Sequence, residues 1–136
     1  MSKVVAILML YLCASTFQQS FDEARLNMRK AVATYRATCI EDTKADPAII
    51  DHVITNLDFP DEPYVKCYFN CVMEKTNAIN NRLELQRSFL RELLDKVPEA
   101  TIDRVVEKCH GIEGDDKCQR SYEILRCGLI YLREIL

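Results

Sequence analysis

Residues 64–75, near the middle of the 136-residue chain, read YVKCYFNCVMEK. Cys67 and Cys71 stand four positions apart, so in a helix their side chains project side by side with roughly parallel Cβ directions. That geometry disfavours a disulfide between them, because a bridge needs Cβ atoms that face each other. The two cysteines should therefore join the helix that carries them to two other segments.

The first twenty residues differ from the rest of the chain. Lys3 is followed by nine apolar residues, and the small residues Cys13, Ala14 and Ser15 come next. A positive start, a short apolar run and small residues are typical of a secretory signal, and the run is too short for a membrane span of about 20 apolar residues. We expect residues 1–20 to be a signal peptide, cleaved between residues 15 and 20.

Removal of this segment changes the cysteine count from seven to six, an even number that suits an oxidising compartment where disulfides persist. We therefore expect a secreted, extracellular protein in which residues 21–136 form a single domain. The formal net charge changes from −3 to −4, because the segment contains Lys3 and no acid. Without a basic surplus, nucleic acid is not an expected partner.

The apolar residues of the mature chain recur at helical spacing, and no glycine occurs before Gly111. This pattern predicts an all-α fold, a compact bundle of about six helices without a sheet. Asp46 and Asp115-Asp116 are predicted N-terminal caps, and the last helix is apolar nearly all round, so it should run through the middle. The expected helices span residues 22–39, 47–59, 61–75, 83–96, 98–109 and 116 onward.

Geometry removes some of the 15 ways in which six cysteines can pair. Cys118 and Cys127 lie about 13 Å apart along one helix and half a revolution around it, so they cannot pair. With the pair Cys67 and Cys71 also excluded, ten connectivities remain. Spacing alone does not choose among them.

The order of the cysteine intervals is more specific. Counting from Cys39, the intervening segments contain 27, 3, 37, 8 and 8 residues. On a helical chain with a secretory signal, this order resembles the insect odorant-binding protein family of the six-cysteine pheromone and general odorant-binding type. The resemblance implies three disulfides, Cys39–Cys71, Cys67–Cys118 and Cys109–Cys127, around an internal hydrophobic cavity.

The resemblance also implies a function. We expect a secreted carrier that transports small hydrophobic ligands, such as odorants, pheromones or related lipophiles, in an internal pocket. Its partners would be the ligand and a chemosensory receptor, it would be a monomer or weak homodimer, and it would not insert stably into membranes.

Two other classes fit a secreted helical protein with disulfides. One is an interaction module that acts through surface contacts on a receptor or partner protein. The other is a membrane-active saposin-like protein, whose cysteine intervals differ from those here. Uptake of a cavity-seeking fluorescent probe would favour the carrier.

The candidate pocket residues come partly from the resemblance and partly from helical faces. Family pockets are lined from positions two beyond the second and third cysteines, which are Phe69 and Met73 here. Gly128 interrupts an apolar helix at a cost of about 1 kcal/mol, which indicates a pocket wall or close helix packing. Ser121 on the same face is a candidate polar group for the ligand, unless its hydroxyl bonds back to the preceding turn. The predicted ligand-binding residues are Phe59, Phe69, Met73, Leu85, Phe89, Leu93, Val106, Ser121, Ile124, Leu125, Gly128 and Leu132.

No motif of an enzyme occurs in the chain, neither G-x-S-x-G, H-E-x-x-H nor a phosphate-binding glycine loop. We expect no catalytic residues, no metal and no cofactor, since oxidised cysteines do not bind metal. His52 and His110 are candidates for a pH switch because imidazole titrates near pH 6.5, but we interpret both as ordinary solvated histidines.

Overall fold

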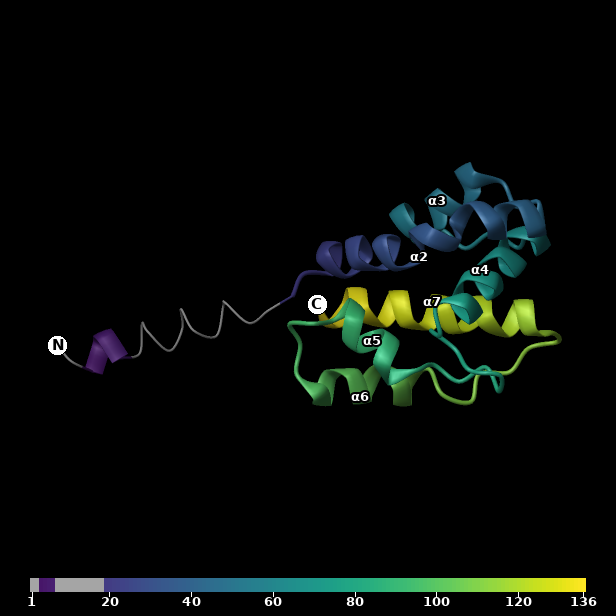
Figure 1. The fold of residues 1–136 in the computed structure, drawn as a ribbon. Helices are drawn as coiled ribbons and strands as arrows, with labels where there is room; N and C mark the ends of the chain where they lie inside the picture. The colour runs from purple at the N-terminus through teal and green to yellow at the C-terminus, as the bar shows by residue number, and fades with distance from the viewer. Residues whose placement is uncertain (1–2, 7–18) are drawn as a thin grey trace.

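The computed structural model describes residues 3–6 and 19–136. Cys13 and most of the predicted signal peptide, with residues 15–18 of its cleavage region, lie outside the described residues. The described domain is helical, as predicted, and its only β feature is an isolated bridge between Ile79 and Leu85. Figure 1 shows the helices α2 (Phe21–Thr43), α3 (Pro47–Asn56), α4 (Pro63–Lys75), α5 (Arg87–Leu93), α6 (Glu99–Lys108) and α7 (Lys117–Ile135).

Side-chain caps fix several helix starts where the sequence predicts them. Asp46 accepts a hydrogen bond from the amide of Ala48 at 2.9 Å, and Pro47 occupies the first turn of α3. Asp116 accepts one from the amide of Gln119 at 2.8 Å at the start of α7. The positions of these helices therefore follow from local chemistry.

Two predicted boundaries near α2 and α4 need correction. The first helix continues one turn beyond Cys39 to Thr43, where Lys44 adopts a left-handed conformation that ends it. Helix α4 begins at Pro63 rather than at residue 61, because the Glu62 carboxylate caps it by accepting from two amides, those of Tyr64 and Val65.

The predicted helix over residues 83–96 is wrong at both ends, since α5 comprises only Arg87–Leu93. At the start, the side-chain oxygen of Asn80 accepts from the amides of Arg82 and Glu84, and Leu83 has a φ of 59°. This local turn competes with the helix for the same backbone donors. At the other end, the Arg91 guanidinium donates to the carbonyl oxygen of Leu94 outside the helix.

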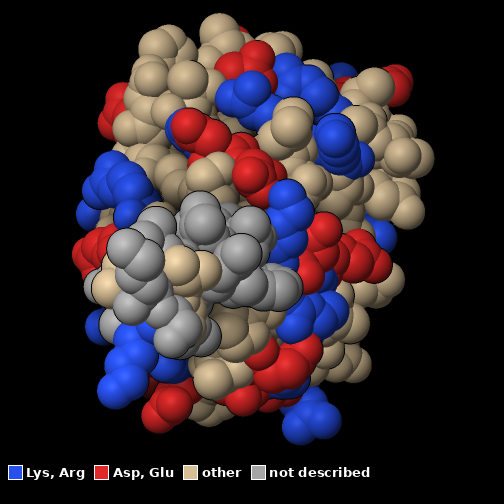
Figure 2. Space-filling view, turned by 90° about the vertical axis from the view of Figure 1, so that its left-hand side faces the viewer, with Lys and Arg blue, Asp and Glu red and all other residues tan. Residues whose placement is uncertain are grey.

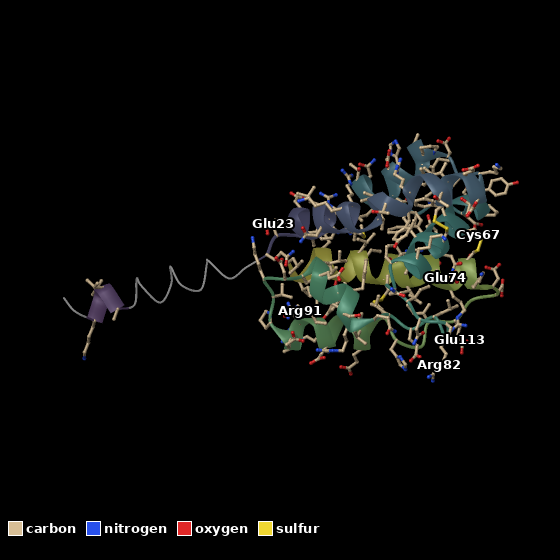
Figure 3. All side chains as sticks on the ribbon, viewed as in Figure 1. Glu23, Cys67, Glu74, Arg82, Arg91 and Glu113 are labelled. Carbon is tan, nitrogen blue, oxygen red and sulfur yellow. A yellow bond between two sulfur atoms is a disulfide. The ribbon has the colours of Figure 1, made fainter. Side chains whose placement is uncertain are left out.

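Three disulfides join four of the helices. Cys39–Cys71 connects α2 to α4, Cys67–Cys118 connects α4 to α7, and Cys109–Cys127 connects the end of α6 to α7, with Cα–Cα distances of 5.8, 4.6 and 5.8 Å. They are the pairs that the family resemblance implies, and Cys67 is labelled in Figure 3. Helix α4 is thus bonded on both sides.

Helix α7 runs between α2 on one side and α5 and α6 on the other (Figure 1). Its contact with α4 includes one buried polar pair, in which the Asn70 side-chain amide donates to the Ser121 hydroxyl at 2.7 Å. Ser121 is completely buried and Asn70 nearly so. Since a buried polar group is costly without a partner, this bond fixes how α4 sits on α7.

An aromatic cluster lies at the same contact. The Tyr122 ring packs edge-on against Phe59, with centroids 5.7 Å apart, and lies tilted by 31° to the ring of Phe69, with centroids 6.0 Å apart. Its hydroxyl donates to the carbonyl oxygen of Pro60 at 3.0 Å. Burial, followed by the nearby Asp58 carboxylate, raises the pKa of Tyr122 to about 12.

The outer surface is charged and mixed in sign. In Figure 2, acidic and basic side chains are interspersed on the face shown. Among the described residues, no helix is both long and apolar enough to span a membrane.

We predict that Ser121→Ala lowers the free energy of unfolding by about 1–3 kcal/mol, because the Asn70 amide loses its buried acceptor. Equilibrium urea unfolding with intact disulfides measures this. The exposed Ser88→Ala on α5 is the matched control, and the double variant Asn70→Leu/Ser121→Ala should recover part of the loss. Equal stability of Ser121→Ala and Ser88→Ala would contradict the assigned bond.

A second prediction concerns Tyr122 and alkaline pH. Its folded pKa of about 12 lies above the ordinary value of 10, so its stabilising effect is complete below about pH 10 and is lost as pH rises toward 12. Unfolding free energy should therefore fall by up to about 2–3 kcal/mol across this window, and Tyr122→Phe should reduce that fall. Tyr64, which is 59% exposed, supplies the control Tyr64→Phe. An unchanged pH profile in Tyr122→Phe would rule out this role.

Candidate functional site

A cavity of about 620 Å³ lies inside the domain, bounded by α2, α3, α4, α5 and α7. Its wall is mostly aliphatic and aromatic, and its volume falls within the range of about 300–1,000 Å³ that is usual for small-molecule sites. It can therefore hold an apolar molecule away from water.

Nine of the twelve predicted pocket residues line this cavity. Phe69 and Met73 contribute from α4, which agrees with their position on a face turned away from the two cysteines of that helix. The others come from the segment before α5, from α5 and from α7. The nine residues are Phe69, Met73, Leu85, Phe89, Leu93, Ile124, Leu125, Gly128 and Leu132.

The remaining three predicted residues do not line the cavity. Phe59 packs against Tyr122, which does not line the cavity either. Val106 faces a separate surface hollow together with charged residues that include Arg82 and Arg120. Ser121 is not a polar handle for a ligand in this geometry, because its hydroxyl accepts the bond from Asn70.

Gly128 contributes an opening rather than a tight contact. A Cβ placed on this residue would meet no atom within 4 Å apart from the helix's own backbone and chain neighbours. Close helix packing is therefore not the reason for the glycine. Its missing side chain leaves space along the cavity wall, which agrees with the pocket-wall interpretation of the sequence.

Helix α2 forms a wall that the sequence analysis missed. None of the twelve predicted residues lies on α2, yet five apolar residues of this helix line the cavity, namely Phe21, Ala24, Met28, Val32 and Ala33. The signal was available, since three of them lie on or near one helical stripe. Other lining residues that were not predicted are Ile50, Ile54, Tyr68, Val72, Ala78, Leu90 and Leu129.

Tyr68 is the most deeply buried polar side chain on the cavity wall. It is 1% exposed, and its ring lies edge-on to Phe69 with centroids 5.1 Å apart. Burial raises the pKa of Tyr68, against an opposing effect of the Arg36 guanidinium. The phenol is therefore neutral at physiological pH and keeps its proton for hydrogen bonding.

The cavity also has a charged rim between α2 and α3. Arg25, Arg29 and Arg36 on α2 and Asp51 and Thr55 on α3 are its polar residues. Arg36 pairs with Asp51 at 3.0 Å, and the Arg25 guanidinium donates to the carbonyl oxygen of Thr55 at 2.7 Å. The Arg29 guanidinium donates to the Thr55 hydroxyl at 2.6 Å.

Neither histidine lies on the cavity. His52 is exposed on α3, with its Nδ1 atom 2.7 Å from the side-chain nitrogen of Asn56. His110 is exposed after α6 and borders the separate surface hollow. Within residues 3–6 and 19–136, no three His, Cys, Asp or Glu side chains cluster as metal ligands.

Comparison with known proteins agrees with this architecture. The model of the PBP/GOBP family matches residues 22–129. General odorant-binding protein 69a of Drosophila melanogaster is 29% identical over 98 residues, which make up 72% of this chain and 66% of that protein. General odorant-binding protein 56a of the same species is 33% identical over 64 residues, 46% of this chain and 45% of that protein. Each alignment spans less than two thirds of the relative's length.

The family match includes all six cysteines of the disulfides and helices α2 to α7, except Phe21 at the start of α2 and the last turns of α7. The resemblance that the cysteine intervals suggested is therefore confirmed, and the chain belongs to the PBP/GOBP family.

Proposed function

We propose that the protein is a secreted, non-catalytic carrier that takes up one small hydrophobic molecule in the cavity and moves it through aqueous fluid. The observation that carries the proposal is the cavity of about 620 Å³ with its largely apolar wall. The names of the two relatives, both general odorant-binding proteins, support odorants and similar lipophiles as the ligand class.

Sequestration follows from ordinary hydrophobic transfer. Apolar ligand surface that leaves water contributes about 25 cal/mol per Å², and the cost of immobilising the ligand offsets part of this gain. Residues such as Phe89, Leu93 and Leu132 provide the apolar contacts. The neutral Tyr68 phenol provides one polar group that can orient a ligand oxygen.

The proposal includes the route out of the cell. Residues 1–20 are removed on secretion, with cleavage between residues 15 and 20, and residues 21–136 form the mature domain. The three disulfides support an extracellular location, because such bonds persist in oxidising compartments.

The carrier function predicts saturable uptake of N-phenyl-1-naphthylamine, a fluorophore that brightens in apolar sites. One molecule should bind per chain, with a dissociation constant on the order of 1–100 µM, and small lipophiles such as dodecan-1-ol should displace it. A fluorescence titration of the mature protein measures both. Failure of the probe to bind would refute the carrier and favour surface recognition, and leakage of phosphatidylcholine vesicles would favour a membrane-active protein.

Gly128 tests the position of the ligand. Gly128→Leu fills the open space beside the glycine, so affinity for bulky lipophiles should fall about tenfold or more while the fold persists. Gly128→Ala should raise the free energy of unfolding by up to about 1 kcal/mol, because alanine favours a helix. Probe displacement and urea unfolding provide the two readouts.

The matched control is Ala100→Leu, which adds a similar volume at an exposed position of α6 away from the cavity. If Gly128→Leu bound bulky lipophiles as tightly as Ala100→Leu does, Gly128 would not belong to the binding site.

A further inference from the structure

The exposed residues among those that line the cavity show where it meets solvent. Most of the lining side chains are buried or half-buried, and the exposed ones all lie on α2 and α3. They are Arg29, Ala33, Asp51 and Thr55. We call the rim formed by Arg25, Arg29, Arg36, Asp51 and Thr55 the α2–α3 mouth.

All the charged residues that line the cavity are at this mouth, three arginines against one carboxylate. The chain as a whole has a net charge of −3, so the positive charge at this mouth is opposite in sign to that of the whole chain. A cationic mouth on an apolar cavity is complementary to a molecule with a hydrocarbon body and an anionic end.

Two of the three arginines are already engaged with negative groups. Arg36 is paired with Asp51, with contacts of 3.0 and 3.4 Å. Arg25 is paired with Asp22 and donates to the carbonyl oxygens of Ile54 and Thr55, which satisfies acceptors at the C-terminal end of α3. The negative groups of the mouth are therefore compensated without the third arginine.

Arg29 is the remaining cation. Among the described residues it forms no ion pair with an Asp or Glu, and its hydrogen bond goes to the neutral hydroxyl of Thr55. In that bond the Thr55 oxygen accepts, so its own proton is free to donate. Arg29 and Thr55 together thus present donors to an oxyanion at the edge of the apolar cavity.

Resting on the carrier function proposed above, we infer that the preferred ligands are aliphatic monocarboxylates, whose chain fills the cavity and whose carboxylate binds Arg29 and Thr55 at the α2–α3 mouth. Charge-assisted hydrogen bonds to a guanidinium are among the stronger polar contacts in proteins. Because Arg29 is exposed and water screens it, the contribution to affinity is modest and depends on salt.

Displacement of N-phenyl-1-naphthylamine by dodecanoate and by dodecan-1-ol, which have equal chain length, tests this inference near pH 8. The mature wild-type protein should bind dodecanoate about threefold to tenfold more tightly than the alcohol at low ionic strength, and added salt should reduce the ratio. Arg29→Gln and Thr55→Val should each lower this ratio, because they weaken the binding of dodecanoate more than that of the alcohol. Arg29→Lys, which keeps the charge, should retain much of it.

Arg104→Gln removes an exposed arginine from α6, outside the cavity, and is the control for net charge. If the alcohol bound but dodecanoate had no advantage, or if Arg29→Gln and Arg104→Gln lowered the ratio equally, the carboxylate site would be refuted and the carrier function would stand. If neither probe nor alcohol bound the wild type, the carrier function itself would fail.

Discussion

The covalent attachment of α4 to both of its neighbours is the constraint on which the rest of the structure depends. Cys67 and Cys71 project from one side of the helix, and their bonds reach α7 and α2 respectively. Phe69 and Met73, on a face turned away from the sulfur atoms, then meet the cavity. An apolar void forfeits packing contacts and favours collapse, so walls that enclose one must be held apart by other means. Bonds between the helices provide such a restraint.

The two helices without disulfides, α3 and α5, are held to α2 by polar contacts. At the end of α5, the side-chain amide of Asn27 on α2 donates to the carbonyl oxygen of Leu93 at 3.0 Å. Helix α3 is held to α2 through Arg25 and Arg36. The residues of α5 that line the cavity are all apolar, whereas α3 contributes Asp51 and Thr55 as well as apolar residues. The charged residues of the cavity therefore gather where α3 meets α2.

Most of the fold could be predicted from the sequence, because the signals that specify it are either local, such as helix caps, or intervals between cysteines. Caps at Asp46 and Asp116 placed two helices, and the ordered cysteines identified the family and, through it, a disulfide pattern that the structure shares. The failure at α5 has a local cause as well. Apolar periodicity over residues 83–96 resembles a helix, but the Asn80 side chain binds two amides and stabilises a turn instead.

The candidate site was harder to predict, because periodicity identifies an inward face without saying what that face meets. Ser121 and Gly128 lie on one face of α7 and were assigned together to the pocket. Ser121 is three residues from Cys118, whose bond holds α4 against α7, so its hydroxyl meets Asn70 in a close contact. Gly128 lies ten residues from that bond, about 15 Å along the helix, and a Cβ placed there would have no atom of another segment within 4 Å. Distance from the contact between α4 and α7 therefore separates the residue that packs from the one that borders the void, a property of two crossing helices that neither sequence segment contains alone.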